Sequence, residues 1–276
     1  MSKSRITVPR MLAYLSLVVG ALIFAYPFVW MVLATLKPEV ELSSINVVPR
    51  EWSTESYELV FRNIPIERSF LNSVIVAIAV TGSALIFGSM ASYSLAKLQW
   101  RGRDAVFGLI LFTMMVPFLV LLIPLYTLVV QFGWTDSLAG LAIPFMMNAT
   151  VVLILRQSFL SIPQDLLDAA RIDGSGEFRI LFTIVWPLSV PALVTAGIIV
   201  FIGNWNEVLW PLIVVREESW MTMPQMVTLF ATGGGAEGKL GPRLAAALLL
   251  AIPVIVAYML FQKRFIASLA STGLKG

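Results

Sequence analysis

Six long apolar stretches dominate this sequence, and they restrict the available folds more than any other feature. A helix of about 20 apolar residues is long enough to cross the hydrocarbon core of a bilayer. The pattern therefore predicts an all-α integral membrane protein of about six transmembrane helices, forming a single transmembrane domain over residues 1–276. The stretches lie at residues 11–36, 69–96, 105–130, 138–158, 188–214 and 243–262.

The composition agrees with a membrane protein and argues against several other classes. Hydrophobic residues make up 58% of the chain and charged residues 13%, whereas soluble domains carry about 45–50% and about 25%. His and Cys are both absent, so the commonest general base, the thiol nucleophile and the usual zinc ligands are missing. We expect no enzyme activity, no metal site and no cofactor bound by this chain. The small net charge of +3 argues against a nucleic-acid partner.

The distribution of Lys and Arg predicts the orientation in the membrane. Basic residues are more frequent in cytoplasmic than in external connections of membrane proteins. If the N-terminus is cytoplasmic, the inner connections hold more Lys and Arg than the outer ones, and acidic residues show the opposite bias. We therefore expect both termini in the cytoplasm and two longer outer loops, at residues 37–68 and 215–242.

The polar connection at residues 159–187 is predicted to form two short helices on the cytoplasmic side. Residues 165–172 place apolar side chains among charged ones, and Asp165 is placed to cap the start of this helix. Gly174 then allows a positive φ angle, which ends a helix and turns the chain sharply. A second helix follows, and Pro187 opens the next span. The segment is thus a helical elbow below the membrane.

The spacing in this elbow resembles the EAA loop of binding-protein-dependent ABC importer permeases. The family pattern is Glu-Ala-Ala, a Gly four residues later, an Ile ten residues further and then Leu-Pro. This chain has Asp in place of the Glu and Trp186 in place of the Leu. The resemblance implies that the elbow is the coupling helix, which docks on a cytoplasmic ATPase subunit. The residues that it assigns to ATPase coupling are Asp168, Ala169, Ala170, Asp173, Gly174, Ile184 and Pro187.

Further stretches are similar to the carbohydrate-uptake branch of that family, which includes the maltose permease. They lie at residues 72–73, 91–103, 133–141 and 204–212. The resemblance implies the MetI-like permease fold and one half of the pore of an ATP-driven importer for a sugar or related solute. It implies a second, distinct permease subunit as heterodimer partner, two ATPase subunits that carry ATP and magnesium, and an extracytoplasmic solute-binding protein. It places the chain among the lipids of a bacterial or archaeal plasma membrane.

The outer loop at residues 215–242 contains the glycine run Gly233, Gly234 and Gly235. The resemblance implies that this run is a candidate contact for the binding protein. Residues 233–239 also fit the phosphate-loop pattern G-x-x-x-x-G-K, but Leu240 replaces the Ser or Thr that would hold magnesium. The predicted external position is a second argument against a nucleotide site.

Glu207 is the only acidic residue inside a predicted span, in the run Asn204, Trp205, Asn206 and Glu207. Carboxylates within membrane segments usually face protein or water, because burial of an unpaired charge is unfavourable. Two interpretations stay open: a structural bond to a neighbouring loop, which we favour, and contact with solute in the pore. Helical spacing does not place all four side chains on one face.

A stand-alone secondary transporter or channel is the alternative function. Such proteins often carry ionisable residues at the middle of the membrane and paired broken helices in repeated halves. Neither feature is evident in the sequence. Proline nevertheless predicts bends in several spans, because it removes a backbone donor. Prolines recur within the spans at Pro27, Pro117, Pro124, Pro144, Pro191 and Pro253.

Overall fold

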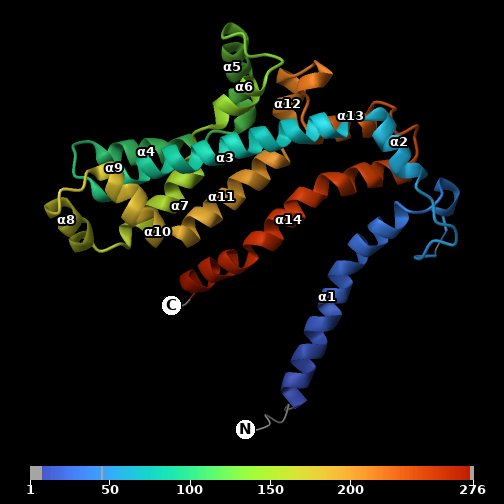
Figure 1. The fold of residues 1–276 in the computed structure, drawn as a ribbon, viewed down its shortest axis with the longest axis horizontal. Coiled ribbons are helices and arrows are strands. Elements are labelled where there is room, and N and C mark those ends of the chain that lie inside the picture. The colour runs from blue at the N-terminus through green and yellow to red at the C-terminus, as the bar shows by residue number, and fades with distance from the viewer. Residues whose placement is uncertain (1–7, 45, 274–276) are drawn as a thin grey trace. The chain divides into compact units, whose positions relative to one another are not determined.

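The computed structural model describes residues 8–44 and 46–273, and every regular element in these ranges is helical (Figure 1). This agrees with the predicted all-α class. The outermost residues of both termini, including Lys3, Arg5 and Lys275, lie outside the described residues, so the cytoplasmic location of the ends stays a prediction.

Three continuous helices are each long and apolar enough to cross a membrane: α1 (Val8–Ala34), α3 (Ile66–Lys97) and α14 (Leu240–Gly273). Three bent helix pairs also meet the criterion when each pair is taken together, so the described residues hold up to six spans. This agrees with the prediction of about six.

The third, fourth and fifth predicted spans are bent rather than straight. The bends are 98° between α4 and α5, 42° between α6 with η2 and α7, and 88° between the segment that ends at Leu188 and α11. The fifth span also ends earlier than predicted, because α11 stops at Trp205 and a separate helix, α12, follows. The bounds are α4 (Arg103–Thr113), α5 (Phe118–Gln131), α6 (Leu138–Ala142), η2 (Ile143–Phe145), α7 (Ala149–Leu160), α11 (Val190–Trp205) and α12 (Leu209–Val214).

Proline accounts for the positions of two of the three breaks. Pro117 immediately precedes α5 and Pro191 is in the first turn of α11, whereas Pro144 lies in η2 before the 42° break, and Asn148 caps α7 after it. Proline has no backbone N–H, and at the start of a helix that donor has no intrahelical partner in any case. The apolar runs are therefore restarted at these points rather than continued.

The chain divides into two compact units. Unit 1 comprises residues 1–65 and 227–251, and unit 2 comprises residues 66–226 and 252–276. Within the described residues, unit 1 contains α1, η1 (Glu39–Glu41), α2 (Glu55–Asn63), most of α13 (Met223–Thr232) and the start of α14. The prediction of a single transmembrane domain over residues 1–276 stays a prediction.

The core of unit 2 is built where α3 crosses α7 and α11. A Cβ atom added to Gly88 of α3 would lie 2.7 Å from a methyl carbon of Val151 of α7, so the two backbones approach closely only because this residue is glycine. The Ser92 hydroxyl donates to the Val152 carbonyl oxygen at 3.0 Å beside this crossing. The fully buried side chains Leu155, Phe159 and Trp210 belong to the same core.

Candidate functional site

The polar connection after α7 forms two short helices at a sharp turn. The first is α8 (Gln164–Ile172), and the second is α9 (Glu177–Ile180). Gly174 lies between them with φ of +83°, a left-handed conformation that favours glycine. α9 continues into a π-helical turn, Leu181–Val185, and a last short helix, α10 (Trp186–Leu188). We call residues 164–188 the elbow.

Two details of the elbow correct the expectations from sequence. Asp165 does not cap α8: the residue before the helix is Pro163, without a side-chain cap bond, and Asp165 lies inside the first turn. Pro187 does not open the next span either, because it lies within α10 and the 88° break comes after Leu188. After the break, Pro191 lies in the first turn of α11, where the fixed φ of proline suits the helix.

α8 turns one face towards the core and the other to the surface. Leu167 is fully buried, and Ala170 packs against the core. On the opposite face Asp168 and Ala169 are exposed, and so are Asp173 and Gly174 at the end of the helix. Of the other sequence-predicted coupling residues, Ile184 is half-buried and Pro187 is exposed. Most of the predicted coupling residues are therefore exposed, while Ala170 and Ile184 pack against the interior beneath them.

Large apolar side chains lie exposed beside this polar surface. Ile172 at the end of α8 is 87% exposed, Phe178 of α9 is 66% exposed, and Leu166 is also exposed. A surface that combines a carboxylate, small residues and exposed apolar side chains is typical of protein interaction sites.

Asp168 belongs to a chain of polar contacts that runs from α8 to α3. Its Oδ1 atom accepts from Arg171 Nη1 at 2.5 Å, and Arg171 also donates to both carboxylate oxygens of Glu177, at 2.8 and 3.1 Å. The Tyr93 hydroxyl of α3 donates to Glu177 Oε2. The hydrogen bonds from Arg171 to Glu177, and then to Asp168, raise the pKa of Arg171, so this guanidinium stays charged. The Asp168 side chain remains 53% exposed.

The contacts through Arg171, Glu177 and Tyr93 were not anticipated from the sequence. The i,i+3 spacing of Asp168 and Arg171 on one helix could have suggested their ion pair. Tyr93 and Glu177 are 84 residues apart, and no local pattern links them.

The C-terminal end of α3 makes a second contact with the elbow region. Lys97 is buried, with 8% of its surface exposed, and its Nζ atom donates to the Ile162 carbonyl oxygen at 2.5 Å. Ile162 lies two residues before α8, so α3 holds the chain immediately before the elbow as well as at Glu177.

The four candidate pore residues at the end of α11 do not form one site. Trp205 is 1% exposed and packs edge-on against Phe70. Asn206 is exposed and donates to the carbonyl of Ile202 in its own helix at 3.0 Å. Asn204 and Glu207 are half-buried.

Glu207 has a local structural contact. Its Oε1 atom accepts from the backbone N–H of Trp210 at 3.1 Å, in the first turn of α12. A carboxylate in this position satisfies a backbone donor that has no partner within the helix. The bond agrees with the structural interpretation, and solute contact by these four residues stays a prediction.

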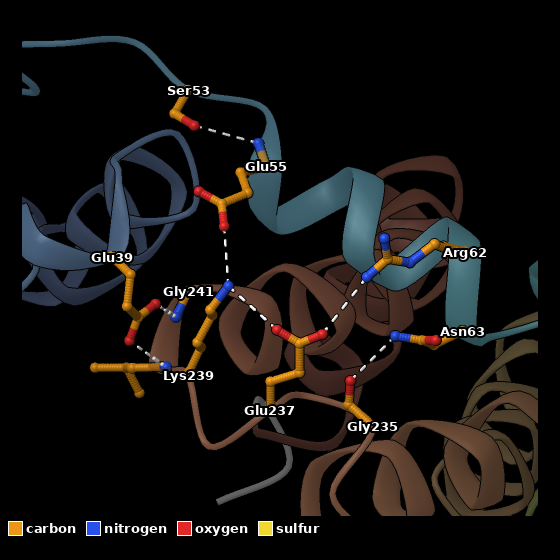
Figure 2. A network of polar contacts seen from close by, with 10 residues as sticks. Glu39, Ser53, Glu55, Arg62, Asn63, Gly235, Glu237, Lys239 and Gly241 are labelled. Atoms are coloured by element: carbon orange, nitrogen blue, oxygen red, sulfur yellow. Dashed lines mark hydrogen bonds and ion pairs between the residues drawn. The ribbon is translucent and has the colours of Figure 1, made fainter.

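Gly235, the last residue of the glycine run, lies in a network of polar contacts within unit 1, seen in Figure 2. The carbonyl oxygen of Gly235 accepts from Asn63 Nδ2 of α2 at 3.2 Å, while Gly234 has φ of +92°. Gly233 directly follows α13, and its N–H donates to the Leu229 carbonyl. Contact of the three glycines with a binding protein stays a prediction.

Ion pairs and a helix cap complete the network. Lys239 Nζ lies 2.9 Å from Glu55 and 3.3 Å from Glu237, which in turn pairs with Arg62 at 3.5 Å (Figure 2). The Glu39 carboxylate accepts from the N–H groups of Leu240 and Gly241, at 2.6 and 2.9 Å, and so caps α14. We call these contacts between residues 39–63 and 235–241 the outer clasp.

The outer clasp argues further against a phosphate-binding loop. The lysine that would bind phosphate is engaged by two carboxylates, and the loop follows helix α13 instead of a strand. Among the described residues, no group of three or more His, Cys, Asp or Glu side chains is arranged to hold a metal ion.

Comparisons with known proteins agree on one family. Residues 84–270 match the family described as binding-protein-dependent transport system inner membrane component. The chain is 35% identical over 262 residues to the arabinooligosaccharides transport system permease protein AraQ of Bacillus subtilis (strain 168), covering 93% of this chain and 92% of that one. It is 30% identical over 274 residues to the sn-glycerol-3-phosphate transport system permease protein UgpE of Brucella abortus (strain 2308), covering 96% and 97%.

A solved structure is similar over nearly the whole length. It is a chain of a bacterial ABC transporter involved in the import of the acidic polysaccharide alginate, with a TM-score of 0.78 and 25% identity. The likeness covers 96% of this chain and 99% of that chain.

Proposed function

The chain belongs to the family of binding-protein-dependent transport system inner membrane components, and from this premise we propose that its elbow couples a solute pore to a cytoplasmic ATPase. The resemblance inferred from the EAA pattern is thereby confirmed. The chain is a permease subunit of an ABC importer, with the helical permease fold and a transport role. It is a component of the inner membrane.

The exposed face of α8 is the observation that supports the coupling role. Asp168 offers an accessible carboxylate beside the small side chain of Ala169, which lets a partner backbone approach closely. A basic group of an ATPase subunit would form a charge-assisted hydrogen bond with this carboxylate. Exposed Ile172 and Phe178 would supply apolar contact area around it.

The rest of the assembly follows from the same reasoning. The chain would form half of the translocation pore, paired with a second permease subunit, and both termini would lie in the cytoplasm. Two ATPase subunits would bind ATP and magnesium, and a solute-binding protein would dock outside. The family description, which names dependence on a binding protein, supports the last of these partners.

A sugar or a related solute is the cargo that the relatives support best. Their names give arabinooligosaccharides and sn-glycerol-3-phosphate, and the similar solved transporter imports alginate. Among these possibilities we favour a neutral sugar.

Charge reversal on α8 tests the coupling role. In the assembled importer, Asp168→Lys should leave membrane insertion and ATP hydrolysis in place but reduce solute uptake at least about tenfold, because the carboxylate that meets the ATPase becomes a repelling cation. Asp165→Lys is the matched control, since Asp165 is exposed on the same helix and lies outside the chain of contacts from Asp168 to Tyr93. It should transport normally.

Two results would contradict the proposal. One is wild-type uptake by the Asp168→Lys importer. The other is purification of the wild-type chain without any ATPase subunit, with solute transport by the chain alone, which would favour the stand-alone transporter.

A further inference from the structure

α3 differs from the other candidate spans of unit 2 because it is unbroken. Its 32 residues form one helix, whereas the three bent pairs of unit 2 turn by 98°, 42° and 88°. At about 1.5 Å per residue α3 is about 48 Å long, which exceeds the thickness of the hydrocarbon core. Figure 1 shows α3 passing beside α11 and reaching the elbow. Because α3 has no break at which it could bend, a displacement of one end of the helix should also displace the other end.

The N-terminal end of α3, on the predicted outer side, holds the segment 219–223. Asn72 Nδ2 donates to the carbonyl oxygens of Ser219 and Met221, both at 3.0 Å. The Ser73 hydroxyl accepts from the Met223 N–H at 2.8 Å. Asn72 and Ser73 are each 4% exposed, so these bonds are buried.

A cation adds to this attachment. Arg68 Nε donates to the Ser219 carbonyl at 3.1 Å, and its guanidinium lies 5.7 Å from the centre of the Trp220 ring. In the sequence, segment 219–223 leads into α13 and then into the glycine run, which is the predicted contact for a binding protein.

The C-terminal end of α3 holds the elbow at two points. Tyr93 bonds Glu177, which follows α8, and Lys97 bonds the carbonyl of Ile162, which precedes it. Tyr93 and Lys97 are four residues apart and therefore lie on the same face of α3. Both are buried. The chain is thus attached to α3 both before and after α8, so a movement of α8 should either break these two bonds or displace α3 as well.

We propose that α3 transmits the movement of the elbow to the outer segment 219–223, with Tyr93 and Lys97 as positioning residues at its inner end and Asn72 at its outer end. This inference rests on the proposed coupling of the elbow to an ATPase. It adds which span carries the signal and which buried side chains attach that span to the moving parts. The bent spans are poor candidates for this role, since their breaks absorb motion.

Hydrogen exchange in the assembled importer tests the proposal without knowledge of the solute. ATP with vanadate is added to trap the ATPase subunits, and exchange is followed at α8 and at the backbone amides of residues 219–223. In the wild type both regions should change. In Tyr93→Phe the response at 219–223 should fall at least about fivefold, as for loss of an allosteric coupling of ordinary size. The response at α8 should remain, because the ATPase still binds there.

Tyr93→Phe is informative because it leaves the far end untouched. It removes one hydroxyl that contacts Glu177, and it changes no atom that contacts residues 219–223. A merely structural role of Tyr93 would not alter exchange at the opposite end of the helix. Glu177→Gln, which keeps the shape of the acceptor, should give a smaller loss than Tyr93→Phe.

Variants at the outer end and within the helix complete the design. Asn72→Ala should abolish the change in exchange at residues 219–223 that ATP with vanadate produces. If the Asn72→Ala chain does not assemble into the importer, Ser73→Ala tests the same end of α3. Ser83→Ala is the matched control, because the Ser83 hydroxyl bonds only carbonyls of α3 itself, at 2.6 and 3.0 Å. It should behave as wild type.

The outcomes separate this inference from the function on which it rests. A wild-type response at residues 219–223 in Tyr93→Phe would overturn the role of α3. An absence of any nucleotide response at α8 in the wild-type importer would instead remove the proposed coupling itself.

Discussion

The elbow and the outer clasp are both networks of charged side chains, but they are built differently. In the elbow the ion pairs lead inward: Arg171 and Glu177 connect the exposed Asp168 to the buried Tyr93 of α3. In the outer clasp the ion pairs lie at the surface, and the side chains of Arg62 and Glu237 are 70% and 48% exposed. The elbow network ends in a packed core, whereas the outer clasp joins two segments of the same unit by direct contacts at the surface.

This difference predicts how each network responds to force or to a partner. Exposed ion pairs contribute little to stability, because water and salt compete for them. Removal of a partner from a buried polar group leaves that group unsatisfied and is much more damaging. The elbow should therefore move together with α3, whereas the ion pairs of the outer clasp should exchange partners readily.

The largest effect is expected at Glu177. Glu177→Ala deprives the buried Tyr93 hydroxyl of its acceptor and leaves Arg171 with Asp168 alone. We expect local opening of the elbow to become easier by about 1–3 kcal/mol, the usual effect of an unsatisfied buried group. Hydrogen exchange of the α8 and α9 amides measures this change.

Glu177→Gln is the control, since it retains an acceptor for Tyr93. Its free energy of local opening should fall by less than half as much as that of Glu177→Ala. Equal protection of these amides in wild type and Glu177→Ala would show that the polar contacts of the elbow stabilise it no more than those of the outer clasp.

An intermediate effect is expected at Glu39 of the outer clasp. Its carboxylate caps the first N–H groups of α14, and loss of a helix cap typically destabilises by about 1 kcal/mol. Glu39→Ala should therefore speed exchange of the first-turn amides of α14 and leave the elbow unchanged. Glu41→Ala is a comparison on the same short helix, because Glu41 bonds backbone N–H groups at residues 50 and 51 instead. A change that spreads into the elbow would contradict the local character of this cap.

The sequence predicted the elements whose signals are local. The length of the apolar runs predicted the spans, and the position of Gly174 predicted the turn of the elbow with its positive φ. The bends were only partly predictable. Pro117 and Pro191 lie at breaks and Pro144 lies in η2 just before one, while Pro27, Pro124 and Pro253 lie inside continuous helices. Whether a proline breaks a helix depends on neighbouring groups that satisfy the freed carbonyl, and these come from distant residues.

The contacts that organise the candidate site were not predictable from sequence patterns. The bond between Tyr93 and Glu177 joins residues 84 positions apart, and the cap of Glu39 on Leu240 spans 201 positions. Such pairs follow from the packing of whole helices, which one sequence does not reveal. The ion pair of Asp168 with Arg171 is different, because it is local: its i,i+3 spacing on α8 could have suggested it.

The smallest effect is expected at Lys239, and it separates the two networks most clearly. Lys239 lies 2.9 Å from Glu55, and this hydrogen bond raises the pKa of Lys239, with a smaller contribution from Glu237. A raised lysine pKa stabilises the clasp fully at pH values below the ordinary lysine pKa of about 10.4, and the stabilisation disappears as pH rises through the higher folded value. At neutral pH the pair is therefore fully charged.

A double-mutant cycle of Lys239→Met and Glu55→Gln at neutral pH measures the coupling between the two side chains, read from exchange of the amides at residues 237–241. We expect a small coupling in low salt that vanishes at about 1 M salt, where the screening length is about 3 Å. The same treatment should leave the protection of α8 and α9 by Tyr93 intact, because the Tyr93 side chain is buried and its hydroxyl is neutral. A Lys239 coupling that survives in high salt would mean that the clasp is as well shielded as the elbow, and the contrast between a rigid inner network and an exchangeable outer one would be lost.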